Sequence, residues 1–270
     1  MDRLFAARWA GGWAGTRVLF ALSGLLWLAT RAPWLADAYA APDMVFSTGP
    51  FYLNDHWIIN LRIAWGVWIL AAIGLLGVIR GGWAMRPGLV AWMAGNGVLL
   101  AAEALDLKAY DRLSYWIALG VLLSPANERE LTQKWRSPVA RWFLLVAFAG
   151  LYGSTGWLKI LEEPRWWTGE VLAHHLVELP YSRGAFPAWV SAHAWLTAPM
   201  SWHTLLFEAG FPFLCWWRRT NPWILLLGVG MHIGILALMN VGPFSFIALS
   251  AYPALLDPDV ARRLWGRVRR

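Results

Sequence analysis

Eight apolar runs recur along the chain, at about residues 17–36, 57–79, 87–105, 113–125, 138–158, 202–217, 223–240 and 244–256. Most of them are long enough to cross the hydrocarbon core of a bilayer, which is about 30 Å thick. Only 14% of the residues are charged, against about 25% in a typical soluble domain. The sequence therefore predicts an all-α, polytopic membrane helix bundle of about eight transmembrane helices, forming one domain over residues 1–270.

Clusters of basic residues between these runs indicate the orientation. They lie before the first run and after the second, fourth, sixth and eighth runs. With eight spans, all of them fall on one side, and an excess of Lys and Arg marks the cytoplasmic side. We therefore expect an integral protein of a bacterial cytoplasmic membrane with both termini in the cytoplasm. The net charge of +7 then reflects orientation in the bilayer, and no nucleic-acid partner is expected.

The histidines and the single cysteine do not predict a metal site. Because Cys215 is the only cysteine, an intramolecular disulfide and thiolate clusters are excluded. His174 and His175 are adjacent, so on a helix they point about 100° apart. Together with His193 or His203 they match no standard zinc spacing. No metal is expected.

Three ionisable residues are candidates for catalysis: Lys159, Glu208 and His232. In the predicted topology Lys159 ends the fifth run at the outer face, and the other two lie in the outer halves of later spans. Ionisable groups inside lipid are costly and are often functional. The simpler alternatives are a lysine that snorkels to the headgroups and a polar Glu–His pair that joins two helices. Convergence of all three on one leaflet favours a site.

The segment 164–201 is too polar and too rich in proline and glycine to be a span. Pro164 can start a helix at Arg165. We predict that this segment forms a lid on, or dipping into, the outer leaflet.

The expected site is a cavity beneath this lid. Glu208 and His232 would line the cavity, with the Lys159 amine at its mouth. Glu208 would either orient His232 or counter the charge of Lys159. A direct salt bridge would keep the lysine protonated and argue against its use as a base. The residues expected to roof the cavity are Trp166, Trp167 and His174.

Five motifs carry a resemblance to a known family. In chain order they read TRVLFALSG, LDLKAYDRLSYW, AGLYGSTGWLKILEEPRWWTGE, FEAGFPF and MHIGILALMNVGPFSFIALSAY. In this order they resemble the horizontally transferred transmembrane (HTTM) domain family, which includes the membrane domain of vitamin K-dependent gamma-carboxylases. The stretch 152–169 is the most specific part, and MNVGPFSF is the next.

The resemblance implies a function for Lys159. In the carboxylases, the lysine that aligns with it is the base that deprotonates vitamin K hydroquinone, and a lysine must be neutral to accept a proton. The resemblance therefore implies a reduced, vitamin K-like quinone as cofactor, and membrane lipid, a lipid-soluble quinone or a peptide as partners. Leu113 stands where the carboxylases have a histidine, so carboxylation of protein glutamates is not expected. The expected substrate-binding residues are Tyr152, Trp157, Trp166, Trp167, His174, Asn240 and Phe244.

Three functions remain open at this point. The first is a carboxylase-like membrane enzyme that uses Lys159 as a base towards a quinol or another lipid-soluble substrate. The second is a non-catalytic subunit that binds a quinone, lipid or partner helices, with Lys159 always charged and paired to an acid. The third is a small carrier, which is disfavoured because no inverted repeat or paired broken helices are visible.

Overall fold

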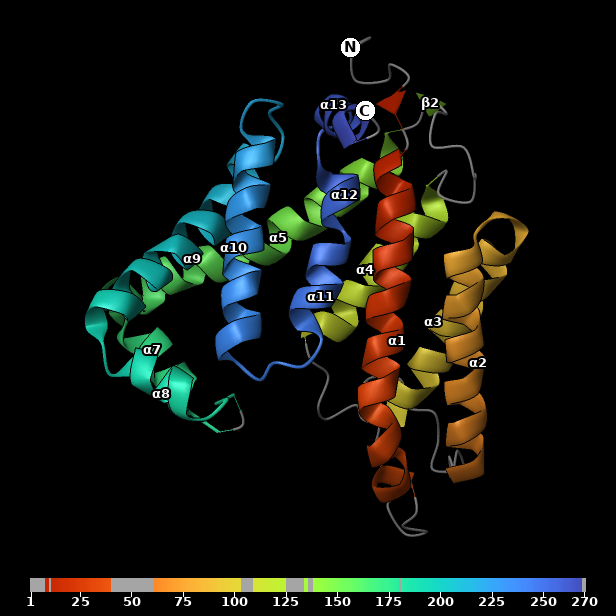
Figure 1. The fold of residues 1–270 in the computed structure, drawn as a ribbon, viewed down its shortest axis with the longest axis horizontal. Helices are drawn as coiled ribbons and strands as arrows, with labels where there is room; N and C mark the ends of the chain where they lie inside the picture. Colours follow the sequence, from red (N-terminus) through yellow and green to blue (C-terminus); the bar gives the residue numbers. More distant parts are fainter. Residues whose placement is uncertain are drawn as a thin grey trace. The chain divides into compact units, whose positions relative to one another are not determined.

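A computed structural model describes residues 8–9, 11–39, 61–102, 109–124, 134–135, 138–179 and 181–268 of the protein. Nearly all of these residues are helical (Figure 1). The chain divides into two compact units. Unit 1 comprises Met1–Arg8, Arg136–Ser245 and Tyr252–Arg270, and unit 2 comprises Trp9–Trp135 and Phe246–Ala251. The helical fold class predicted from the sequence is confirmed.

Unit 2 is built mainly from helices in the first half of the chain. Small residues let α2 and α3 approach closely, since a Cβ atom on Gly74 would lie 2.5 Å from the carbonyl oxygen of Gly88. Arg17 donates hydrogen bonds to the carbonyl groups of Val78 and Ile79, which have no partner within the last turn of α2. The described elements are β1 (Arg8–Trp9), which begins in unit 1, α1 (Gly11–Tyr39), α2 (Leu61–Arg80), η1 (Gly82–Ala84), α3 (Met85–Ala102), α4 (Ala109–Leu123) and β2 (Lys134–Trp135).

Unit 1 holds the three ionisable residues singled out in the sequence. Its helices are α5 (Val139–Glu162), α6 (Arg165–Thr168), α7 (Glu170–Val177), α8 (Ala185–Ser191), α9 (Ala194–Leu214), α10 (Asn221–Leu238), α12 (Tyr252–Leu255) and α13 (Pro258–Val268). Helix α11 (Phe244–Ser250) begins in unit 1 and continues into unit 2. Within unit 1, α9 packs against both α5 and α10.

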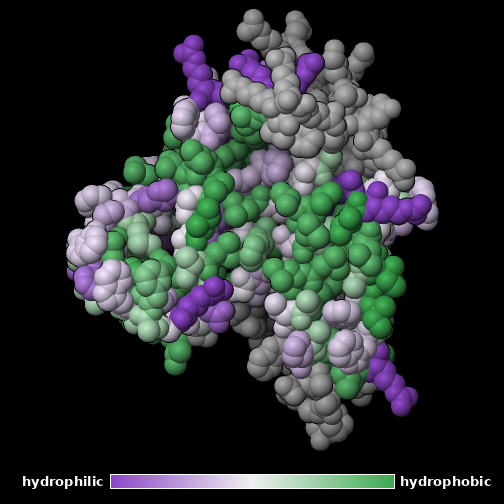
Figure 2. All heavy atoms as spheres, viewed as in Figure 1, coloured by the Kyte–Doolittle hydropathy of each residue, from purple (hydrophilic) through white to green (hydrophobic). Residues whose placement is uncertain are grey.

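Four helices of the described residues are long and apolar enough to cross a membrane. They contain Gly11–Pro33, Leu61–Arg80, Val139–Glu162 and Asn221–Leu238. Large apolar side chains on the last of these face outward, among them Trp223, Leu226 and Ile233, and apolar residues cover much of the face seen in Figure 2. These features are typical of a membrane protein.

The predicted count of eight spans is not confirmed. Each of the eight apolar runs overlaps a helix, but α3, α4, α9 and the short pair α11 and α12 do not qualify as spans by length and composition. Helix α4 has 15 residues, and α9 contains two prolines and Glu208. Parts of the predicted runs, at 57–60, 103–105 and 125, lie outside the described residues, as do both ends of the chain.

The first part of the segment predicted as a lid folds into short helices, whereas its last residues, 194–201, belong to the long helix α9. Helix α6 begins at Arg165 after Pro164, as predicted, and α7 and α8 follow before α9 starts. Apolar side chains fix these helices to the longer ones. Trp166 and Leu172 share a buried cluster with Leu205 of α9. A second buried cluster joins Leu176 and Val190 to Leu238 of α10.

Candidate functional site

Helices α5 and α9 come into backbone contact beside the charged residues. A Cβ atom on Gly156 would lie 2.5 Å from the backbone nitrogen of Ala209 and 2.7 Å from the Cβ of Glu208. Only glycine therefore permits this approach without a shift of the backbone. Lys159 follows Gly156 by less than one turn, so the crossing brings its side chain to Glu208.

Lys159 and Glu208 form a direct ion pair. The Nζ of Lys159 donates a hydrogen bond of 2.5 Å to the Oε2 of Glu208. The side chains are 23% and 9% exposed, respectively. The ammonium also lies 4.7 Å from the centroid of the Trp166 ring, within the range of a cation–π contact. Lys159 thus points into unit 1, and Glu208 contacts it, which is one of the two arrangements considered from the sequence.

His232 belongs to a separate buried network. Its Nε2 lies 2.9 Å from the hydroxyl of Tyr152, and its Nδ1 lies 3.2 Å from the hydroxyl of Ser245. The hydroxyl of Tyr152 is also 3.4 Å from that of Tyr252. The His232 side chain is fully buried and both ring nitrogens have partners, so the network satisfies the polar atoms of this buried ring.

The Tyr152–His232 network and the Lys159–Glu208 pair share helix α5. Seven residues separate Tyr152 from Lys159, which corresponds to about 10 Å along the helix axis. The ring of Phe244 lies beside the network, with its centroid 5.4 Å from that of His232. Of the predicted site residues, one group thus comprises Lys159, Glu208 and Trp166, and the other comprises Tyr152, His232 and Phe244.

The remaining predicted substrate-binding residues have exposed side chains. Trp157 and Trp167 are 42% and 49% exposed, and the indole of Trp157 contacts Phe213. His174 is exposed and lies near Glu178. Asn240 is exposed, and its backbone N–H donates to the carbonyl of Tyr181. These four residues do not converge on one cavity.

Helix α6 is held over the ion pair by contacts with α9. The hydroxyl of Ser201 donates to the carbonyl of Trp166, and the indole of Trp202 donates to the carbonyl of Trp167 at 2.7 Å. Gly169 makes the next turn with φ +80°, and a Cβ there would lie 2.5 Å from the backbone nitrogen of Ala198. Both the positive φ and the close approach require glycine. These contacts hold Trp166 in place against the Lys159 ammonium.

A cavity of about 310 Å³ lies beside these groups, between α7, α9 and α10. Lys159, Glu208 and His232 do not line it, so it is not the cavity that was predicted from the sequence. The lining is mostly apolar and is rich in methionine and glycine. It includes Leu172, Leu176, Met200, His203, Met231, Gly234, Ile235 and Leu238.

Two polar side chains in the cavity wall donate hydrogen bonds to backbone carbonyls. The Nε2 of His203 lies 2.8 Å from the carbonyl oxygen of Leu227. A carbonyl can only accept, so Nε2 carries the proton and Nδ1 of the neutral ring is an acceptor. The hydroxyl of Thr204 donates to the carbonyl of Met200 at 3.1 Å. Both side chains can therefore accept a hydrogen bond from a ligand.

Glu163, shortly after Lys159, forms an exposed ion pair with Arg165. Glu163 accepts hydrogen bonds of 2.8 Å from the guanidinium of Arg165, which lowers the pKa of the Glu163 carboxyl.

In the described part of the chain, no group of three or more His, Cys, Asp or Glu side chains could hold a metal ion.

Reasoning from the sequence did not identify the cavity or the partners of His232. Ser245 and Tyr252 are ordinary residues of apolar helices in the sequence, and His203 was considered only as a metal ligand. The spacing of Met200 and His203 did carry information about the cavity, because residues three apart lie on one face of a helix.

Comparison with protein-family models, curated proteins and solved structures found no match to this chain. The assignment of its function therefore depends on the geometry described above.

Proposed function

We propose that the protein is a polytopic membrane protein of the HTTM type that binds a reduced, lipid-soluble quinone between α7, α9 and α10. The observation that carries the proposal is the apolar cavity of about 310 Å³, a volume at the lower end of small-molecule sites. Its wall is formed partly by α10, one of the helices long enough to cross a membrane. A ligand that partitions into lipid could reach such a cavity from the bilayer.

The hydrogen-bonding character of the wall favours the reduced form of the ligand. His203 and Thr204 both donate to backbone carbonyls, so their remaining capacity is to accept. A quinol carries two O–H donors, whereas a quinone carries only acceptors. An acceptor facing another acceptor forms no hydrogen bond, and a buried polar group without a partner costs about 1–3 kcal/mol. Met200 and Met231 suit a flat ring, because thioethers pack well against aromatic faces.

The ion pair favours binding over base catalysis by Lys159. A lysine must be neutral to remove a proton, and the carboxylate of Glu208 at 2.5 Å stabilises the charged ammonium. In this proposal Lys159 stays charged and holds α5 to α9, while Trp166 covers the pair. This corresponds to the non-catalytic alternative drawn from the sequence.

A carboxylase-like enzyme is the second candidate. One observation favours it: Lys159, Glu208 and the Tyr152–His232 network lie within about two turns of one another on helices that pack together. For Lys159 to act as a base, its proton would first have to pass to Glu208 or to solvent. Eight spans, with the termini in the cytoplasm of a bacterial inner membrane, remain part of the proposal for either function.

Occlusion of the cavity tests the proposal. Gly234 lines the cavity, and a Cβ atom there would have nothing within 4 Å. The Cβ atom of Gly234→Leu should therefore fit without a clash, and the rest of the side chain should occupy part of the cavity. Gly150 of α5 has equally open surroundings and does not line the cavity, so Gly150→Leu is the matched control. Binding of a short-chain naphthoquinol to the purified protein can be measured by tryptophan fluorescence under anaerobic conditions. We expect Gly234→Leu to lose this binding and Gly150→Leu to keep it. Equal affinity of both variants would reject the site.

A further inference from the structure

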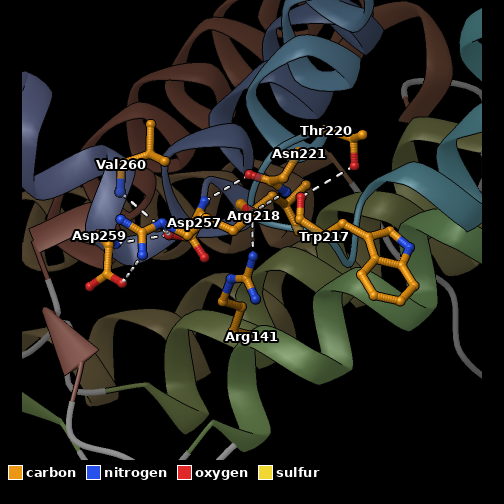
Figure 3. A network of polar contacts seen from close by, with 9 residues as sticks. Arg141, Trp217, Arg218, Thr220, Asn221, Asp257, Asp259 and Val260 are labelled. Carbon is orange, nitrogen blue, oxygen red and sulfur yellow. Dashed lines mark hydrogen bonds and ion pairs between the residues drawn. The ribbon is translucent and has the colours of Figure 1, made fainter. Parts of the chain in front are cut away.

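The start of α13 is tied to the end of a candidate membrane span. The backbone N–H of Asp257 donates a hydrogen bond of 2.8 Å to the Oδ1 of Asn221, the first residue of α10. The Nδ2 of Asn221 donates to the carbonyls of Cys215 and Leu255 at 2.9 and 3.1 Å. Figure 3 shows the hydrogen bond between Asn221 and Asp257. If α10 crosses a bilayer, Asp257 lies at the level of the membrane surface.

Two further sets of contacts fix the first turn of α13. The Oδ1 of Asp257 accepts hydrogen bonds from the backbone N–H groups of Asp259 and Val260 at 3.1 and 3.4 Å, which caps the helix. Arg218, in the turn after α9, lies 3.9 Å from Asp257 and 3.3 Å from Asp259 (Figure 3). Helix α13 therefore keeps a defined direction relative to α10.

That direction runs across α10. Figure 1 shows α13 nearly end-on, whereas α10 stands upright beside it, and both belong to unit 1. A helix that starts at the end of a span and runs across it lies along the bilayer surface.

The two sides of α13 differ in chemistry. Its sequence, PDVARRLWGRV, has apolar residues at 260, 261, 264, 265 and 268, the spacing of an amphipathic helix. Ala261 is buried against the protein, while Leu264 is 49% exposed. Arg262 and Arg263 are exposed, and no ion pair or hydrogen bond joins their side chains to the described residues. Two guanidinium groups therefore face outward beside an exposed leucine.

Exposed tryptophans mark the same end of unit 1. Trp217 lies in the turn between α9 and α10, and Trp223 lies in the first turn of α10. Both are 68% exposed. Tryptophan is enriched where membrane meets water, so this end has the composition of an interface.

We propose that α13 is an interfacial helix that binds anionic phospholipids. Arg262 and Arg263 contact the headgroup phosphates, and Leu264 enters the boundary between headgroups and acyl chains. Charge complementarity selects lipid of negative charge, and the exposed leucine beside the arginines favours a bilayer surface over a soluble anion. The basic side of the chain is also the predicted cytoplasmic side. This surface is independent of the cavity between α7, α9 and α10.

Lipid binding by the purified full-length protein tests the proposal. Native mass spectrometry in neutral detergent, with added phosphatidylglycerol or phosphatidylcholine, counts the bound lipids. The double variant Arg262→Gln/Arg263→Gln should weaken phosphatidylglycerol binding by roughly tenfold or more, because each arginine near an anionic surface contributes to the free energy of binding. Binding of phosphatidylcholine should be unchanged. The matched control is Arg62→Gln with Arg112→Gln, which removes the same charge from two other exposed arginines. An equal loss in both double variants, or no loss in the first, would overturn the proposal.

A fluorophore at position 264 gives a second measurement. Cys215 is buried, so Leu264→Cys can be labelled selectively with an environment-sensitive dye. In vesicles that contain phosphatidylglycerol the dye emission should shift to the blue relative to phosphatidylcholine vesicles, because Leu264 moves into the lipid boundary. Emission typical of bulk water in both membranes would contradict an interfacial helix.

Discussion

Glu208 determines how Lys159 can act. A carboxylate that is 9% exposed cannot reach bulk water without moving its helix, and its ion pair with the 23% exposed Lys159 supplies the compensating charge. Removal of one partner of a buried pair leaves the other uncompensated, which costs more than the pair itself contributes. A substitution at either residue therefore affects folding as well as any chemistry.

Lys159→Met should destabilise the protein, by up to about 3 kcal/mol, because it leaves the Glu208 charge without a partner. A double variant that adds Glu208→Leu should recover much of the loss, since it removes the stranded charge. Thermal unfolding in mild detergent measures both effects. If Lys159→Met unfolds at the wild-type temperature, the ion pair contributes nothing to the packing of α5 against α9.

Lys159→Arg distinguishes the two candidate functions. A guanidinium keeps its charge near neutral pH and pairs well with a carboxylate, but it cannot serve as a base there. Under the binding proposal this variant should keep the wild-type affinity for a naphthoquinol. The opposite result is that the wild-type protein converts the quinol, and that Lys159→Arg binds the quinol but no longer converts it. This result would show that the protein is an enzyme.

His203 should give the cavity a preference for ligands that donate hydrogen bonds. The wild-type protein should bind a naphthoquinol more tightly than the corresponding dimethyl ether, by roughly 2- to 10-fold, which is the contribution of one hydrogen bond. His203→Phe keeps the ring and removes the acceptor, so it should reduce this preference. An unchanged preference in His203→Phe would show that the hydroxyl groups of the ligand bind elsewhere.

At the scale of helices, the crossing of α5 and α9 depends on Gly156. Alanine stabilises a helix by about 1 kcal/mol relative to glycine, so Gly150→Ala, with open space around its Cβ, should raise the melting temperature or leave it unchanged. Gly156→Ala places its Cβ 2.5 Å from the backbone nitrogen of Ala209 and should lower the melting temperature in spite of that gain. Equal effects of the two variants would show that the crossing tolerates a wider spacing.

Local signals in the sequence were sufficient to predict individual helices but not their contacts. Pro164 locates the start of α6, because proline fits the beginning of a helix, and the apolar runs locate the long helices. The pairing of Lys159 with Glu208 depends on Gly156 meeting Ala209 across two helices, which no local pattern encodes. The hydrogen bond from Tyr152 to His232 spans 80 residues, and the cavity exists only where α7, α9 and α10 pack together. Such features arise from tertiary packing.

At the scale of the whole molecule, α9 is the helix whose placement decides the topology. It has 21 residues, enough to cross about 30 Å of hydrocarbon, but it is not among the four helices that qualify by composition. Three of its polar residues, Thr197, Ser201 and Glu208, are buried. A helix that buries its polar side and exposes Trp202, Leu206 and Phe213 suits a lipid environment better than its average composition suggests.

The position of α9 can be measured by cysteine accessibility. If α9 crosses the bilayer, the end of α5 and the turn before α10 lie on opposite sides. If α9 does not cross, they lie on the same side.

Glu162 and Arg219 are exposed at these two places, and Cys215 is buried. In intact cells, a membrane-impermeant maleimide should therefore label Glu162→Cys and should label Arg219→Cys only after the membrane is opened. Labelling of both from outside would place the charged turn at 218–219 on the outer side, contrary to the positive-inside rule. Lys159 would stay at the outer face beside Glu162, but α9 would not cross the bilayer, and the number of spans would then have to fall below eight.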